Sequence, residues 1–299
     1  MLYSLEHIRA VIEDYTLYLF NDGRRPPLHH PVGRVDEPGY LHASSLGFCS
    51  NAQIRERRGA TVFPSLLPAA MPATRMRMLE GVRMAEIVQE AFVWHGIQRP
   101  DLYVETEAYF KSPVLRLQGN MDVFMYWGKD ATAIEVKHRA YAYNRVPGPR
   151  MSDLLQMIAY YHLLNEKYNL VRVALAVVST PGWREQGNER SALRLYRLKR
   201  RSDDQGFELI DEDDELVEDY GEPLFVSHKR FQDIIDNFSY PDKLNPFESW
   251  ECGYIEKKPA NGNAGRYRPR CPYWCHDTMP KDGEVTIAFH GEDEERHFD

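Results

Sequence analysis

The segment VRVALAVVST, residues 171–180, constrains the fold more than any other part of this 299-residue chain. It is an almost continuous apolar run, which indicates a strand whose two faces are both buried. A strand of that kind needs a layer of other structure on each side of its sheet. We therefore expect an α/β fold in which helices cover both faces of one central sheet.

Alternating apolar and polar residues predict three consecutive strands before this segment, and helical spacing predicts a helix on either side of them. The order helix, three strands, helix, strand is typical of an α/β sandwich with a mixed central sheet. The predicted elements are helices at 44–58, 75–95, 151–168 and near 226–238, and strands at 102–110, 114–127, 132–139, 171–180 and 192–200.

The first twenty residues predict an amphipathic helix that packs on the body of the protein, because apolar residues recur at helical spacing from Leu2 to Leu19. Glu6, Glu13 and Asp14 interrupt these apolar residues, so the segment lacks the pattern of an export signal. No uninterrupted apolar stretch approaches membrane-spanning length. We expect a cytoplasmic protein with no membrane partner, in which cysteines stay reduced.

The net charge of −8 is unevenly distributed along the chain. Residues 203–222 carry −11 and residues 282–299 carry −6, so the remainder carries +9. We expect the two acidic segments to be solvated loops or tails. Charges act over only about 8–10 Å in physiological salt, so the basic remainder permits a polyanionic ligand such as nucleic acid.

Two neighbouring predicted strands carry candidate catalytic residues. Asp122 lies in GNMDVFM, and Glu135 and Lys137 lie in IEVK, where alternation places both side chains on one face. A short link joins the strands, so we expect them to pair and to bring Asp122 close to Glu135. Adjacent carboxylates repel unless a cation lies between them, and their oxygens, with a backbone carbonyl, suit Mg²⁺ or Mn²⁺. A metal, a water and a lysine are what phosphodiester hydrolysis requires. Taken alone, a surface ion pair between Glu135 and Lys137 explains those two residues equally well.

The order GNMD, IEVK and a following helix with QMIAY resembles the PD-(D/E)XK nucleases, specifically their RecB-like branch. The resemblance implies a restriction-endonuclease-like core in which Asp122, Glu135 and Lys137 are catalytic. It also implies that Gln156 and Tyr160, one helical turn apart, lie beside the active site and help to hold DNA.

The chain departs from this family in the first helix of the expected core. The family has Gly-x-x-x-His-Glu there, and its histidine binds the metal, whereas GVRMAE in this sequence has Ala85 in that place. Either the adjacent Glu86 contributes a ligand, directly or through water, or Asp122, Glu135 and the Val136 carbonyl hold the metal alone.

Four cysteines, Cys49, Cys252, Cys271 and Cys275, form a second candidate site. Four thiolates make a soft site that selects an iron–sulfur cluster or zinc. One early cysteine and three late ones resemble the iron–sulfur subset of the same branch, which includes CRISPR-associated exonucleases. This resemblance implies a structural [4Fe–4S] cluster that joins the N- and C-terminal parts. Zinc, with His276 able to replace a thiolate, and unligated thiols are the alternatives.

We expect an N-terminal helix and loop at 1–40, a nuclease core at 41–240, a cysteine region at 241–280 and an acidic tail at 281–299. The expected activity is that of a Mg²⁺- or Mn²⁺-dependent deoxyribonuclease, an exonuclease on single-stranded DNA or DNA ends, with endonuclease activity left open. One alternative is a catalytically weak or inactive DNA-binding or scaffold subunit with the same fold and cluster. Another is a protein that zinc holds together and that has no nucleic-acid role. Expected partners are DNA and proteins of recombination, replication or CRISPR adaptation.

Overall fold

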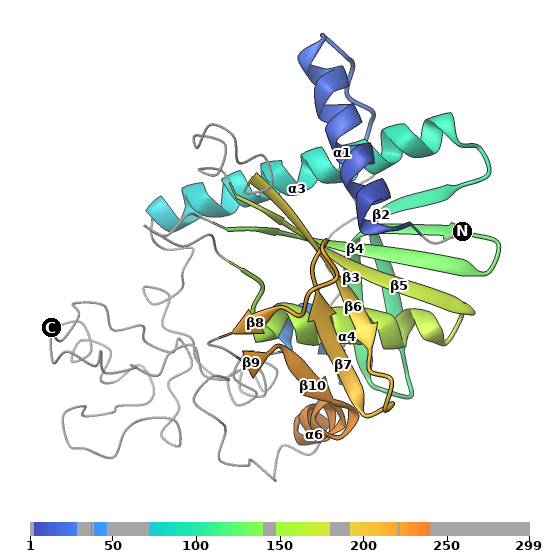
Figure 1. Cartoon of the computed structure of the whole chain (residues 1–299), viewed down its shortest axis with the longest axis vertical. Coiled ribbons are helices and arrows are strands. Elements are labelled where there is room, and N and C mark those ends of the chain that lie inside the picture. Colours follow the sequence, from blue (N-terminus) through green and yellow to red (C-terminus); the bar gives the residue numbers. More distant parts are fainter. Residues whose placement is uncertain are drawn as a thin grey trace, which may run out of the picture.

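The computed structural model describes residues 3–28, 37, 39–46, 72–139, 148–179, 192–219 and 222–239 (Figure 1). The helices are α1 (Leu5–Phe20), α3 (Pro72–Gln98), α4 (Met151–Asn165) and α6 (His228–Ser239), with a 3-10 turn, η1 (Ala43–Ser45). The strands are β1 (Leu41–His42), β2 (Tyr103–Ser112), β3 (Leu117–Trp127), β4 (Asp130–His138), β5 (Leu170–Val178), β6 (Leu193–Arg200), β7 (Gly206–Ile210), β8 (Glu218–Asp219), β9 (Glu222–Pro223) and β10 (Phe225–Ser227). No described helix is both long enough and apolar enough to cross a membrane.

The central sheet is mixed, as the sequence predicts, and it has eight strands where the sequence predicted five. Its order is β1-β3-β4-β5-β6-β7-β10, with β2 also paired to β3, while β8 and β9 form a separate pair. β4 and β5 run parallel, as do β1 and β3, and the other neighbours run antiparallel. Short links suffice for the antiparallel hairpins, whereas the parallel β4–β5 pair requires a crossover, which contains α4.

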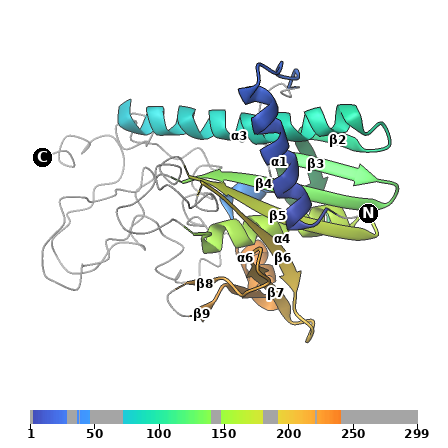
Figure 2. The same cartoon turned by 45° about the horizontal axis from the view of Figure 1, so that its top comes forward.

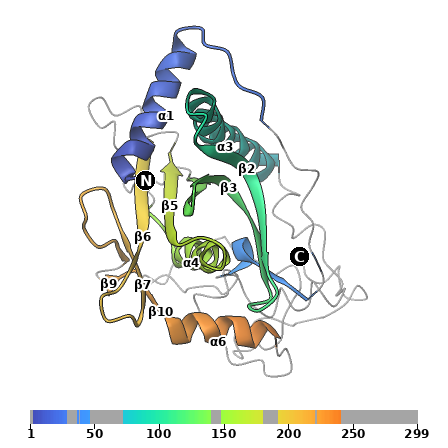
Figure 3. The ribbon, with the colours of Figure 1, turned by 90° about the vertical axis from the view of Figure 1, so that its right-hand side faces the viewer.

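Strand β5 is buried on both faces, which confirms the prediction made from its apolar sequence. Val173, Leu175 and Val177 belong to the hydrophobic cluster that contains α4 residues. Ala174 and Ala176 belong to the cluster that contains α1 and α3 residues. Figure 3 shows α1 and α3 on one side of the sheet and α4 on the other. The sheet therefore separates two core layers.

Helix α1 belongs to the layer formed with α3, and Figure 2 shows the two helices crossing. The Ser4 hydroxyl caps α1 by accepting a hydrogen bond from the backbone N–H of His7 at 3.3 Å. Ile8 and Tyr15 are fully buried, and the Tyr15 hydroxyl donates to Glu90 of α3 at 2.8 Å. The N-terminal segment is thus a helix packed on the body, as predicted.

Two segments differ from the sequence predictions. The acidic segment 203–222 contains strand β7, whose Phe207, Leu209 and Ile210 are buried, because the short apolar run within GFELI completes the sheet despite the acids around it. The helix predicted at 44–58 begins as the 3-10 turn η1, and residues 47–58 lie outside the described part of the chain. All four cysteines and the acidic tail also lie outside it.

Candidate active site

The acids predicted to bind metal lie where β3 and β4 stop pairing. The β3–β4 ladder ends at Val123↔Ile134. At its N-terminal end β3 pairs with β1 instead, through Leu117 and Gln118. β2 occupies the other edge of β3, so β1 and β4 share one edge and leave residues 119–122 between them. Here the Asp122 Oδ2 accepts a hydrogen bond from the Val136 N–H at 2.6 Å. The side chain replaces the backbone partner that a continuing ladder would have given this amide.

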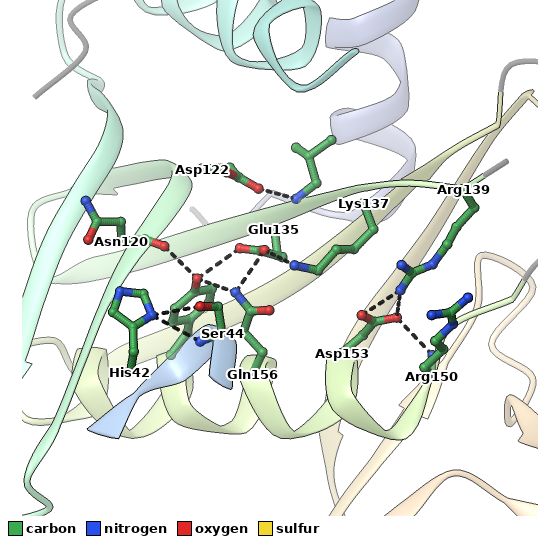
Figure 4. A network of polar contacts seen from close by, with 12 residues as sticks. His42, Ser44, Asn120, Asp122, Glu135, Lys137, Arg139, Arg150, Asp153 and Gln156 are labelled. Carbon is green, nitrogen blue, oxygen red and sulfur yellow. Dashed lines mark hydrogen bonds and ion pairs between the residues drawn. The ribbon is translucent and has the colours of Figure 1, made fainter. Parts of the chain in front are cut away.

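Glu135 lies at the centre of a hydrogen-bond network between β4 and α4 (Figure 4). Its Oε1 accepts from Lys137 Nζ at 2.5 Å and from Gln156 Nε2 at 2.9 Å. Its Oε2 contacts the Tyr160 hydroxyl at 3.0 Å, and only 4% of the residue is exposed. The structure therefore brings together Glu135, Lys137, Gln156 and Tyr160, all of which the sequence singled out.

Helix α4 directs Gln156 and Tyr160 toward β4 because residues four apart share a helical face. The Tyr160 hydroxyl accepts from Gln156 Nε2 at 2.7 Å and donates to the Asn120 carbonyl of β3 at 2.6 Å. This close approach depends on Gly119. A β-carbon at Gly119 would lie 3.1 Å from Tyr160 Cε1 and 2.9 Å from the β-carbon of Ala43 in η1. The glycine thus lets α4 and η1 lie against the backbone of β3.

The site holds more negative than positive charge. Burial raises the pKa of Asp122 well above its ordinary value, although part of the residue stays accessible to water. The negative charges of Glu135 and Glu107 raise this pKa further, while the Val136 N–H and Lys137 act in the opposite direction. Burial disfavours the charged form of Lys137, but the Glu135 carboxylate outweighs it and raises the pKa of the lysine. A divalent cation would relieve the repulsion among the acids.

The third carboxylate, Glu107, was not predicted from the sequence. It lies on β2 opposite Asp122, at a position that the β2–β3 ladder skips. Its φ of 54° is unusual for a residue other than glycine. Its Oε1 accepts from Gln89 Nε2 of α3 at 2.8 Å. A signal was present in the sequence, since three successive strands carry acids at facing positions, here Glu107, Asp122 and Glu135.

The predicted metal ligand on α3, Glu86, forms an ion pair with a neighbouring arginine. The Glu86 carboxylate lies 2.8 Å from Arg83, and Ala85 packs against the hydrophobic cluster of α1 and α3. A role of Glu86 as a ligand stays a prediction. Within the described ranges, no three His, Cys, Asp or Glu side chains converge as a metal site.

The oxygens of Asp122, Glu135 and the Val136 carbonyl are hard donors of the kind that Mg²⁺ and Mn²⁺ prefer. Protein donors engage both carboxylates, because the Val136 N–H contacts Asp122 and Lys137 contacts Glu135. A cation bound at Glu135 Oε1 would have to displace the Lys137 ammonium. The lysine and a metal ion therefore compete for the same oxygen.

No protein-family model matches the chain, and no curated protein matches it. The crystal structure of SSO0001 is a distant structural match, with a TM-score of 0.40 and 12% sequence identity. The match covers 82% of this chain and 91% of SSO0001. It is too distant to assign a family or the role of any residue.

Proposed function

We propose that the protein is a metal-dependent nuclease that hydrolyses phosphodiester bonds of DNA. The observation that carries this proposal is the placement of Asp122 and Glu135 where two strands diverge, with Lys137 in contact with Glu135. The resemblance of the GNMD, IEVK and QMIAY segments to the RecB-like PD-(D/E)XK nucleases supports it.

In this proposal Asp122, Glu135 and the Val136 carbonyl hold Mg²⁺ or Mn²⁺. When bound, such an ion polarises a phosphoryl oxygen and lowers the pKa of a bound water. Without a cation, the Glu135 carboxylate raises the pKa of Lys137, so Nζ holds its proton. A cation at Glu135 would release this ammonium, which would then be free to donate hydrogen bonds to phosphate oxygens or to the attacking water.

Gln156 and Tyr160 position Glu135 rather than react. One donates to Oε1 and the other contacts Oε2, so both carboxylate oxygens are held from the α4 side. Groups behind a ligand that fix its orientation increase its effectiveness, because little reorganisation is needed when a cation binds. The resemblance implies that these two side chains also help to hold DNA, but Gln156 is 3% exposed and Tyr160 0%, so in this structure they are placed to act on DNA through Glu135.

Digestion of end-labelled single- and double-stranded DNA by purified protein tests the proposal. With Mg²⁺ or Mn²⁺, the wild type should shorten the DNA, and EDTA should stop it. Asp122→Asn and Lys137→Met should each lower the rate by on the order of 100-fold or more. Lys199→Met is a matched control, since Lys199 also pairs with a glutamate, Glu208, at 3.1 Å. Wild-type rates in both site variants would refute the assigned site.

A DNA-binding or scaffold subunit with weak or no catalytic activity is the second candidate. Ala85 supplies no ligand where the resembled family has histidine, and Glu86 pairs with Arg83. Such a protein would bind labelled DNA but leave it intact with every divalent metal tried. A binding measurement beside the digestion separates the two candidates.

We also propose a structural [4Fe–4S] cluster on Cys49, Cys252, Cys271 and Cys275, with zinc as the alternative. Protein purified without oxygen should then be brown with a broad visible absorption band, whereas a colourless preparation that contains zinc would decide for zinc. Other parts of the proposal rest on the resemblance and on sequence pattern. They are a cytoplasmic location, a preference for single strands or ends, and partners in recombination, replication or CRISPR adaptation.

A further inference from the structure

A second group of cationic side chains lies beyond Lys137. Glu135, Lys137 and Arg139 alternate along one face of the chain, and the Arg139 N–H still bonds to the Val178 carbonyl at 2.9 Å. The Arg139 Nη2 donates to both oxygens of Asp153, in the first turn of α4, at 2.7 and 2.5 Å. The face of β4 that carries the predicted catalytic residues thus continues into an arginine held by α4.

Arg150, the residue before α4, adds a second guanidinium to this group (Figure 4). Its backbone N–H donates to Asp153 Oδ2 at 2.9 Å, while its side chain is exposed. Asp153 thus holds the Arg139 guanidinium and the Arg150 backbone, and the three side chains together carry a net charge of +1.

A purely structural role accounts for only part of this arrangement. Asp153 is 3% exposed and caps α4, so its ion pair with Arg139 has a clear structural purpose. The cap uses only the backbone of Arg150, so it does not explain the arginine side chain. In addition, the buried Nε of Arg139 has no hydrogen-bond partner among the described residues.

We propose that Arg139 and Arg150 bind a backbone phosphate of the DNA strand next to the phosphate at Glu135 and Lys137. This inference rests on the proposed function. The guanidinium fork matches the geometry of phosphate oxygens and stays charged at neutral pH. At about 3.3 Å per residue, Arg139 lies about 13 Å along the strand from Glu135. That separation assigns the arginines to a different phosphate from the one at Glu135 and gives the line along which the bound strand crosses the site.

Binding without cleavage tests this assignment. Anisotropy of a fluorescein-labelled single-stranded oligonucleotide in EDTA gives Kd at several salt concentrations for the wild type and Arg150→Gln. Loss of one phosphate contact should reduce the slope of log Kd against log salt by about 0.7. It should also weaken binding by roughly threefold at low salt, for every oligonucleotide sequence. Arg201→Gln, which removes an exposed arginine paired with Asp203, should change neither quantity.

A second variant tests the role of Arg139, the partly buried arginine. Arg139→Gln combined with Asp153→Asn removes both charges without leaving one of them buried alone, and a melting curve confirms that it folds. Because one positive and one negative charge are lost together, the salt slope should stay close to that of the wild type, whereas Kd should rise because the guanidinium donors of Arg139 are lost. Wild-type Kd in both variants, or no binding by the wild type in low salt, would overturn the assignment. Cleavage by the wild type is measured separately. The nuclease proposal can therefore be refuted while Arg150 is still found to bind DNA, or supported while Arg150 is found not to bind it.

Discussion

Replacing Asp122 by asparagine should make the metal-free protein more stable while abolishing cleavage. Burial, with repulsion from Glu135 and Glu107, raises the pKa of Asp122, so its ionised form costs folding free energy at neutral pH. Asparagine has nearly the same shape, and its side-chain oxygen can still accept the hydrogen bond from the Val136 N–H. The substitution therefore removes a charge and little else.

The size of the effect follows from the linkage between protonation and folding. Each pKa unit above the unfolded value is worth about 1.4 kcal/mol once the pH exceeds both pKa values. We expect Asp122→Asn to raise the free energy of unfolding by about 1–3 kcal/mol at neutral pH. For a protein of this size, each kcal/mol corresponds to about 2–4 °C in Tm. Because the folded pKa lies above the ordinary 3.8, the advantage of the variant should appear only as the pH rises above that value.

Magnesium should reduce or reverse this difference. A ligand at 100 times its Kd stabilises the folded state by about 2.7 kcal/mol, and only the wild type keeps both carboxylates. Thermal denaturation followed by circular dichroism, in EDTA and in Mg²⁺, measures both effects. Asp101→Asn, at an exposed ion pair, is the matched control and should stay within about 0.5 kcal/mol of the wild type. The reasoning fails if metal-free Asp122→Asn is less stable than the wild type, or if Mg²⁺ raises both Tm values equally.

Tyr160→Phe removes a fully buried hydroxyl that contacts Glu135, and urea denaturation should show a loss of about 1–3 kcal/mol. Tyr103→Phe, at an exposed hydroxyl, should cost less than about 0.5 kcal/mol, and equal losses would contradict the prediction. His162 stacks on Phe231 of α6, and burial lowers its pKa from 6.5 to about 4. Because the unfolded chain accepts this proton more readily, stability should fall by up to about 3 kcal/mol as the pH drops from 6.5 to 4. His162→Phe should flatten that part of the stability curve, and an unchanged curve would assign the effect to other groups.

Local features of this protein follow from its sequence alone. The alternation of side chains along any extended backbone places Glu135 and Lys137 on one face, and they are in contact. The continuous apolar run of β5 requires cover on both faces, and the two core layers provide it. The i,i+4 spacing of Gln156 and Tyr160 places both on one face of α4. Each of these inferences depends on neighbours within a few residues, which is why sequence is sufficient for them.

Only the tertiary structure decided how these local features combine. Asp122 contacts the Val136 amide because β1 and β4 share one edge of β3. The pairing of β1 with β3 joins Leu41 to Leu117, two residues that are far apart in the chain. Glu107 faces Asp122 through the register of the β2–β3 ladder, and β7 joins the sheet although the segment around it is acidic. Register and burial depend on which distant segments pack together, and that is settled by the summed energy of the whole fold rather than by any short pattern.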